Sequence, residues 1–206
     1  MTRAYVVFND SNNLYFPVKA ALNPYTGEEA YCGGLPQFFG GKVDAQETNP
    51  DAVRREVAEE SHLTYLLTAK SLLQVMQSTM AIDEKEEKFE DWYFYLTDKW
   101  RKPTEHKWPE TLQTWRMCPA KFREMCFVAS APIGKLLGAL GLKEGDELDT
   151  APWLLEKLPK LADALVEAAL GTAPSWAKSM LETQPTKDFL QSETLDGFAC
   201  AVCTFL

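Results

Sequence analysis

The segment at residues 41–63, GKVDAQETNPDAVRREVAEESHL, limits the possible folds more than any other part of the chain. It predicts a loop followed by a helix over 50–61. The start of this helix is well marked: Asn49 can cap it, Pro50 suits its first position and Asp51 suits the positive end of its dipole. The fold must therefore accommodate a helix that begins shortly after a pair of glycines.

Three glutamates of this helix lie on one face. Glu56, Glu59 and Glu60 are three and four residues apart, and like charges at that spacing destabilise a helix by roughly a few tenths of a kcal/mol per pair. A cation would offset the repulsion, and an all-oxygen ligand set favours Mg²⁺, Mn²⁺ or Ca²⁺ over zinc. Taken alone, however, such a helix is more often only a solvent-exposed acidic face.

Two neighbouring features suit a cation site. Arg55 and Glu47 can form a guanidinium–carboxylate fork that holds the loop against the helix. The pair Gly40-Gly41 is expected to end a short strand at 35–39, and glycine lets backbone carbonyls approach an ion closely.

The whole segment resembles the Nudix box, Gly-x5-Glu-x7-Arg-Glu-U-x-Glu-Glu-x-Gly-U, in which U is a bulky apolar residue. The residues that match its defined positions are Gly41, Glu47, Arg55, Glu56, Val57, Glu59, Glu60 and Leu63. The five charged matches would arise by chance in roughly one window per million, so the resemblance is specific. One position departs, because His62 replaces the final Gly. A left-handed backbone is expected there, and His tolerates it better than most residues.

The resemblance implies a hydrolase that uses Mg²⁺, or Mn²⁺ in its place. When the metal ligands of the family are transferred to the matching positions of this sequence, they are the backbone carbonyl of Gly40 and the carboxylates of Glu56, Glu59 and Glu60. Glu47 and Arg55 would orient these ligands. The substrate would be a nucleoside diphosphate joined to another group X, and hydrolysis would give a nucleoside monophosphate and phosphorylated X.

The general base varies within this family. The first glutamate of the box, Glu56, is one choice, and an acid on a later loop is another. Glu105 and Glu110 are the loop candidates, because they precede a strand expected at 111–117, although each is also readily explained as a surface Glu. Asp91, on a predicted strand, is a weaker candidate.

The rest of the chain predicts strands first and helices later. Alternating apolar residues and turn signals predict strands at 4–9, 13–20, 71–80, 89–97 and 111–117. Helices are expected near 133–140, 152–170, 174–182 and 185–192. This order predicts an α+β fold, and the resemblance implies a Nudix-type α/β/α sandwich with a mixed sheet. We expect a Nudix domain at 1–130 and a helical C-terminal extension at 131–206, packed on the same domain.

Charge and cysteine content restrict the expected partners and the expected cellular compartment of the protein. The chain has 30 acidic and 21 basic residues, a net charge of −9, so a broad surface for nucleic acid or anionic lipid is not expected. No leader-like or membrane-spanning segment is evident, and five cysteines, an odd number, suit a reducing cytoplasm. Cys200 and Cys203 have CxxC spacing, but a single such pair in an apolar tail is more typical of structural thiols than of a zinc site.

The choice of nucleotide is left open, because the sequence carries none of the subfamily markers considered, those for ADP-sugars, NADH, diadenosine polyphosphates or coenzyme A. Aromatic residues that can stack on a base are Tyr5, Phe16, Tyr31, Phe38 and Trp92, although most aromatics on strands belong to the core. The competing interpretation is a non-catalytic Nudix-fold module that senses a nucleotide or binds a protein. The intact box glutamates favour the enzyme, and a homodimer formed through the helical extension is compatible with either.

Overall fold

The computed structural model describes residues 1–19, 28–29, 32–68, 72–83, 88–102, 126–146, 153–175, 177–178 and 192–206. Its strands are β1 (Thr2–Asn9), β2 (Asn13–Lys19), β3 (Phe39–Lys42), β4 (Leu66–Leu67), β5 (Leu73–Asp83), β6 (Lys88–Thr97), β7 (Trp100–Arg101) and β8 (Cys126–Pro132). Its helices are α1 (Asn49–Glu60), α3 (Ile133–Leu140), α4 (Trp153–Thr172) and α6 (Ser192–Cys203). The strand expected at 111–117 lies outside the described residues.

The main sheet is mixed. Its strands run in the order β5-β6-β1-β2-β8, and β3 also pairs with β1. β1 and β6 are parallel, whereas the other pairs are antiparallel. The short strands β4 and β7 form a separate two-stranded sheet. Parallel pairing places β6 beside β1, so that residues almost ninety positions apart in sequence become neighbours in the sheet.

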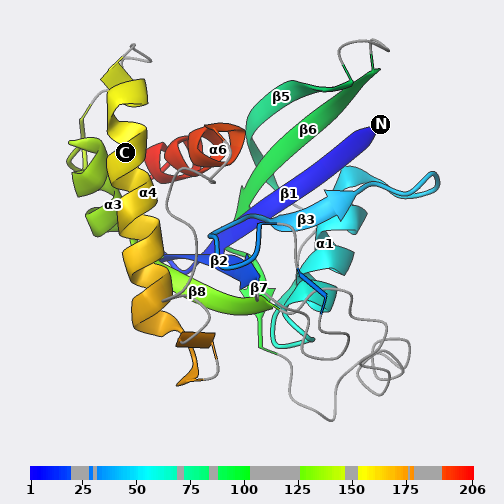
Figure 1. Ribbon diagram of the computed structural model, residues 1–206, viewed down its shortest axis with the longest axis horizontal. Helices are drawn as coiled ribbons and strands as arrows, with labels where there is room; N and C mark the ends of the chain where they lie inside the picture. Colours follow the sequence, from blue (N-terminus) through cyan, green and yellow to red (C-terminus); the bar gives the residue numbers. More distant parts are fainter. Residues whose placement is uncertain are drawn as a thin grey trace.

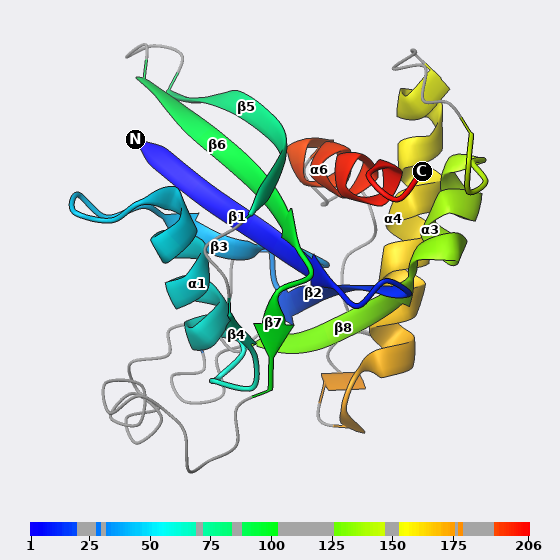
Figure 2. The ribbon, with the colours of Figure 1, turned by 180° about the vertical axis from the view of Figure 1, so that it is seen from behind.

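Helices cover both faces of this sheet, because successive residues of a strand point to opposite sides. From β1, Ala4, Val6 and Phe8 pack in one buried cluster with α1. Val7, from the same strand, belongs to a second cluster with α3, α4 and α6. Figures 1 and 2 show α1 well separated from these three helices, with the sheet between them. The fold is therefore the expected α+β, α/β/α sandwich.

The strand before α1 differs from the prediction. The strand expected at 35–39 is β3 at Phe39–Lys42, and the glycine pair lies inside it instead of ending it. Gly40 and Gly41 pair with Tyr5 and Ala4 of β1. Glycine is tolerated in a strand where another backbone approaches closely, which is the case here.

The C-terminal part contains two elements that the sequence pattern does not predict. β8 pairs with β2 along its whole length, from Asn13↔Pro132 to Lys19↔Cys126. α6 spans 192–203, and of the helix expected at 185–192 only residue 192 is described. α3 coincides with the helix expected at 133–140, and α4 nearly coincides with that expected at 152–170.

The helical extension shares its packing with the strands. β8 crosses residue 130, and α3, α4 and α6 bury apolar side chains in the same cluster as β2. Of the helix expected at 174–182, only 174–175 and 177–178 are described. The division of the chain at residue 130 stays a proposal.

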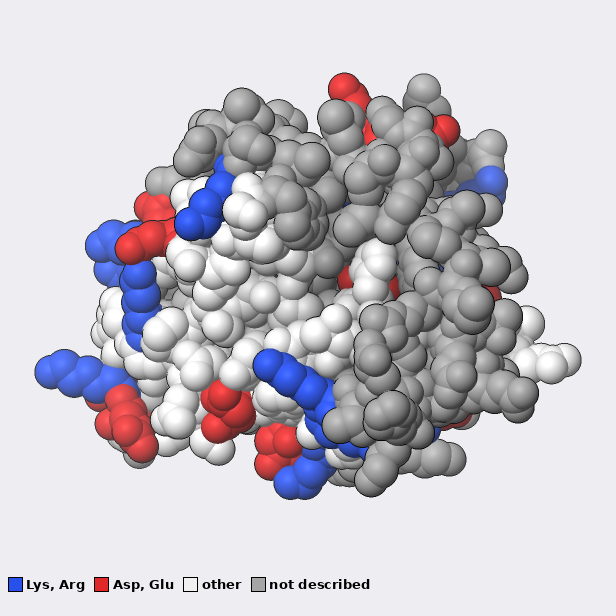
Figure 3. Space-filling view, turned by 90° about the horizontal axis from the view of Figure 1, so that it is seen from below, with Lys and Arg blue, Asp and Glu red and all other residues white. Residues whose placement is uncertain are grey.

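The described surface offers few clues to a large partner. None of the helices in the described residues is long and apolar enough to span a membrane. On the face drawn in Figure 3, Lys and Arg side chains are interspersed with Asp and Glu side chains, and most of the described surface there is uncharged.

Candidate active site

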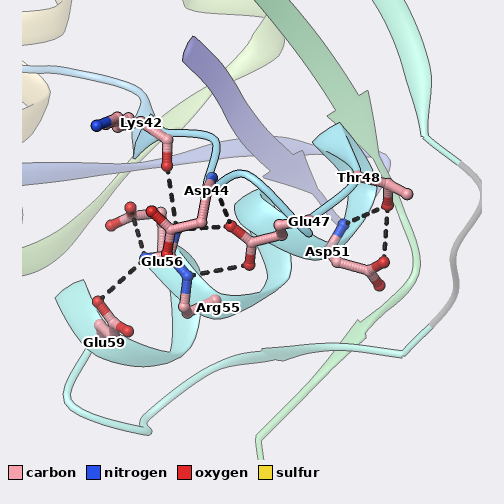
Figure 4. Close-up of polar contacts among 8 residues, drawn as sticks. All are labelled: Lys42, Asp44, Glu47, Thr48, Asp51, Arg55, Glu56 and Glu59. Atoms are coloured by element: carbon pink, nitrogen blue, oxygen red, sulfur yellow. Dashed lines mark hydrogen bonds and ion pairs between the residues drawn. The ribbon is translucent and has the colours of Figure 1, made fainter. Parts of the chain in front are cut away.

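The start of α1 positions its acidic face beside β3. Thr48, not Asn49, caps the helix: its side-chain oxygen accepts from the Asp51 amide at 3.3 Å and its hydroxyl donates to Asp51 Oδ2 at 2.7 Å (Figure 4). Asn49 is already the first helical residue, and its side chain donates to the hydroxyl of Tyr95 at 3.1 Å. The prediction of an Asn49 cap is thus wrong by one residue, because two adjacent residues could cap the helix and the contact with Tyr95 of β6 is not visible in the sequence.

The far end of α1 holds a left-handed turn. The His62 amide donates to the Glu59 carbonyl at 3.0 Å and the Leu63 amide to the Ala58 carbonyl at 2.8 Å, which is the Schellman pattern. His62 has φ +50°, the conformation for which the final Gly of the motif is suited, and Leu63 has φ +62°. Leu63 is fully buried, so packing holds its backbone in this uncommon conformation.

The glycine pair of β3 lets that strand approach both β1 and α1. Gly40 has φ +145°, and a Cβ there would lie 2.2 Å from the backbone oxygen of Ala4. A Cβ on Gly41 would lie 2.8 Å from Oε1 of Glu56. The first glycine is needed for the sheet and the second leaves space for a carboxylate.

Arg55 ties the loop to the helix. Its Nε and Nη2 donate to the two carboxylate oxygens of Glu47 at 3.0 and 2.9 Å, which is the fork expected from the sequence (Figure 4). Nη2 also donates to the backbone oxygen of Lys42 at 3.1 Å. The guanidinium lowers the pKa of Glu47 through this hydrogen bond, although partial burial opposes the shift. Glu47 therefore stays ionised and fixes the guanidinium.

Glu60 and Glu56 lie against the glycine pair of β3, and Glu59 lies beside Arg55. Glu60 is buried and accepts from the Gly40 amide at 2.9 Å. Glu56 Oε1 accepts from Arg55 Nη1 at 2.8 Å, and Glu59 Oε2 lies 3.5 Å from the same nitrogen. Burial and the neighbouring charge of Glu56 raise the pKa of Glu59 to about 7. The cluster thus carries more negative charge than Arg55 offsets.

The chemistry of these donors suits a hard divalent cation, which prefers carboxylate and carbonyl oxygen. Among the described residues, no three carboxylate, thiol or imidazole groups are already arranged to enclose an ion. Instead, Arg55 Nη1 contacts both Glu56 and Glu59. These contacts use one oxygen of each carboxylate, so the second oxygen of Glu56 and of Glu59 could bind an ion while Arg55 keeps its fork with Glu47.

Of the other acids proposed from sequence, the structure describes Asp91. Glu105 and Glu110 lie outside the described residues. Asp91 accepts from the hydroxyl of Thr79 on β5 at 3.0 Å. Asp91 is therefore explained by a cross-strand contact in the β5–β6 hairpin.

The aromatic candidates divide into two groups. Phe16 and Phe38 are buried in the core, and Tyr31 lies outside the described residues. Tyr5 and Trp92 are only partly buried. The sequence pattern does not single out their neighbours Arg3 and Glu90, whose ion pair joins β1 to β6 with an N–O distance of 2.7 Å.

The CxxC pair lies on α6, away from the acidic cluster. Cys200 and Cys203 are free, half-buried thiols. Burial and the neighbouring Cys200 raise the pKa of Cys203 to about 11. Both thiols are thus partly withdrawn from solvent, as structural cysteines commonly are.

Comparison with known proteins places the motif in a family. The NUDIX domain family model matches residues 3–134. Similar solved structures include a MutT NUDIX hydrolase from Burkholderia pseudomallei (19% identity, 50% of this chain and 70% of that chain, TM-score 0.37). They also include an ADP compounds hydrolase (16% identity, 82% and 72%, TM-score 0.42) and the E. coli ORF135 protein (14%, 84% and 92%, TM-score 0.38). No curated protein sequence matches the chain significantly.

The family match spans more than half of the chain and contains the entire acidic segment, so the chain belongs to the Nudix family. Its class is that of the Nudix-type pyrophosphohydrolases, enzymes that act on phosphorus-containing anhydrides.

Proposed function

We propose that the protein is a Mg²⁺-dependent hydrolase that cleaves the diphosphate linkage of a nucleoside diphosphate joined to another group X. The products are a nucleoside monophosphate and phosphorylated X. The observation that supports this most strongly is the placement of the three box glutamates. Glu60 accepts from the Gly40 amide of β3, and Glu56 and Glu59 share the guanidinium of Arg55. Burial, and after it the neighbouring charge of Glu56, raises the pKa of Glu59 to about 7, and a divalent cation would favour the ionised form.

In this proposal, the carboxylates of Glu56, Glu59 and Glu60 and the backbone carbonyl of Gly40 hold Mg²⁺, or Mn²⁺ in its place. A bound ion would offset charge on the diphosphate oxygens and lower the pKa of a water molecule. Glu47 holds Arg55 by two hydrogen bonds, and Arg55 in turn orients Glu56. Water adds to one phosphorus atom while the P–O–P linkage to the other breaks.

A general base must accept the proton of the attacking water. Glu56 is one choice, since Arg55 Nη1 contacts both Glu56 and the neighbouring Glu59. Glu110 and Glu105 are the alternatives on the later loop. Asp91 is less suited, because its carboxylate accepts from Thr79 on the neighbouring strand.

The second candidate function is a non-catalytic module that senses a nucleotide or binds a protein. Loss of box glutamates would favour it, yet each glutamate is present and oriented by a hydrogen bond or an ion pair. We also propose that the protein resides in a reducing cytoplasm and that it forms a homodimer. The free thiols of Cys32, Cys200 and Cys203 are compatible with a reducing cytoplasm.

The test is hydrolysis of a substrate panel with Mg²⁺ or Mn²⁺. The panel holds ADP-ribose, other nucleotide sugars, NADH, diadenosine polyphosphates, coenzyme A, and ordinary and oxidised nucleoside triphosphates. Glu60→Gln keeps an acceptor for the Gly40 amide but removes the charge. Glu156→Gln, at an exposed position on α4, is the matched control.

Turnover that requires the metal, survives in Glu156→Gln and is lost in Glu60→Gln would support the proposal and name the substrate. Folded wild-type protein that turns over no member of the panel with either metal would contradict it. The binding module would then be the better explanation.

A further inference from the structure

Tyr5 and Trp92 form a continuous aromatic surface on neighbouring strands. Their ring centroids are 5.2 Å apart with an interplanar angle of 50°. Tyr5 also stacks on Phe94, with centroids 5.4 Å apart and planes at 22°. Phe94 is almost completely buried, whereas Tyr5 and Trp92 keep part of their surface exposed. The surface therefore has a buried end and an accessible end.

The accessible end is held rigidly by an ion pair. Glu90 Oε2 accepts from Arg3 Nε at 2.7 Å and from the indole nitrogen of Trp92 at 3.2 Å. The Arg3 guanidinium carbon lies 6.0 Å from the centroid of the Trp92 ring. The polar atom of the indole is thus satisfied within the protein, and its ring is fixed before any ligand arrives. A preorganised ring loses little conformational entropy on stacking.

The aromatic surface lies on the face of the sheet opposite α1 and meets the carboxylate cluster at Gly40 of β3. Tyr5 pairs with Gly40 across β1 and β3, and a Cβ on Gly40 would lie 2.9 Å from Cδ1 of the Tyr5 ring. The Gly40 amide in turn donates to Glu60. β3, β1 and β6 are adjacent strands (Figure 1). Gly40 and Trp92 are two strand spacings apart and offset by two residues along the strands, a separation of about 12 Å.

Helix α6 covers the neighbouring part of the same face. At Gly197 of α6, a Cβ would lie 2.9 Å from Phe94 and 3.2 Å from Phe38, so the helix backbone rests directly on these rings. Trp92 is two residues nearer to the start of β6 than Phe94 and is more exposed. The difference in burial indicates that Phe94 serves the core, whereas Trp92 presents part of its ring at the surface.

We infer that Tyr5 and Trp92 are the stacking platform for the nucleobase of the substrate. A nucleoside diphosphate carries an aromatic ring one ribose away from its phosphates, which matches an aromatic surface one to two strands away from the carboxylate cluster. The inference rests on the proposed function, which supplies the class of ligand, and it adds that the enzyme recognises the nucleobase of that ligand. Trp92 is then a residue that distinguishes nucleotides from diphosphates without a base.

The experiment measures binding without turnover. Isothermal titration with Mg²⁺ compares the α,β-methylene analogues of ADP, GDP, CDP and UDP with methylenediphosphonate, which has the same bridge and no base. The variants are Trp92→Ala, Trp92→Leu and Trp92→Phe. Phe89→Ala is the matched control, because Phe89 lies on the same strand, is 56% exposed and is an odd number of residues from Trp92, hence on the opposite face.

The wild type should bind at least one nucleoside analogue roughly tenfold or more tightly than methylenediphosphonate, in line with the usual contribution of base stacking. Trp92→Ala and Trp92→Leu should lose most of this additional affinity for the nucleoside analogue, whereas Trp92→Phe and Phe89→Ala should keep it. Affinity for methylenediphosphonate should be the same in every variant that circular dichroism shows to be folded.

The inference would be overturned if the wild type bound no nucleoside analogue more tightly than methylenediphosphonate. It would also be overturned if Phe89→Ala lost as much of this additional affinity as Trp92→Ala, or if Trp92→Ala and Trp92→Leu kept all of it. Failure of the proposed hydrolase is distinguishable from these results. A binding module without turnover would still show the additional affinity that depends on Trp92.

Discussion

The carboxylate of Glu56 occupies the space that a side chain on Gly41 would fill, since a Cβ there would lie 2.8 Å from Glu56 Oε1. The close neighbour is the end of a flexible side chain and not backbone, so the strand can accept a methyl group if the carboxylate moves. Gly41 therefore controls where Glu56 lies more than whether the chain folds.

We expect Gly41→Ala to lower kcat by roughly 100-fold, the usual effect of displacing a catalytic group by about 1 Å. The free energy of unfolding should change by less than about 1 kcal/mol, because no backbone clash arises. Steady-state kinetics and urea unfolding would measure the two effects. Unchanged kcat in a folded variant would show that the position of Glu56 does not matter for the reaction.

Gly40→Ala, in contrast, should strongly destabilise the fold. Its Cβ would meet the backbone oxygen of Ala4 at 2.2 Å, and φ +145° is strained for any other residue. We expect the free energy of unfolding to fall by about 3 kcal/mol or more. Urea unfolding beside Gly41→Ala tests this contrast between adjacent glycines, and equal stability of the two variants would contradict it.

Arg55→Lys should lower both stability and activity. A lysine cannot form the two-pronged contact with Glu47 while also reaching Glu56, so we expect the free energy of unfolding to fall by about 1–3 kcal/mol and kcat by at least about tenfold. Arg54→Lys is the control. Within the part of the chain that the structure describes, Arg54 makes a 3.5 Å contact with Asp51, and its loss should cost less than about 0.5 kcal/mol. Comparable losses in both variants would argue against a special role for the Arg55 fork.

The Arg3–Glu90 pair should make stability depend on pH. Burial of Glu90 opposes ionisation, but hydrogen bonds from Arg3 and Trp92 prevail and lower its pKa below the ordinary 4.5. The unfolded chain therefore takes up the proton first as pH falls. The contribution of Glu90 is present above its unfolded pKa and is lost as pH falls through its folded pKa.

Glu90→Gln should accordingly reduce the free energy of unfolding near neutral pH by about 1–2 kcal/mol, the lower part of the range for charged hydrogen bonds because Arg3 is partly exposed. The difference from wild type should shrink below the ordinary pKa of a Glu side chain. Urea unfolding of both proteins across this range is the measurement, and a difference independent of pH would refute the assigned cause.

The sequence by itself determined the helix at α1, its acidic face and the Arg55–Glu47 fork. These depend on residues close together in the chain, for which helical periodicity and charge alone set the geometry. The left-handed turn at His62 belongs to the same group, because the end of a helix requires it locally. The family and its α+β fold followed from that one segment and the order of the elements.

The tertiary structure decided the rest. Glu60 is bound by the amide of Gly40, 20 residues away, and Arg3 meets Glu90 across 87 residues because β1 and β6 are parallel neighbours. Strand β8 and helix α6 are likewise specified by packing against β2 and Phe94, and their local sequence gave no clear signal. Contacts between distant residues depend on which apolar faces are buried together, and this is a property of the whole fold and not of any single segment.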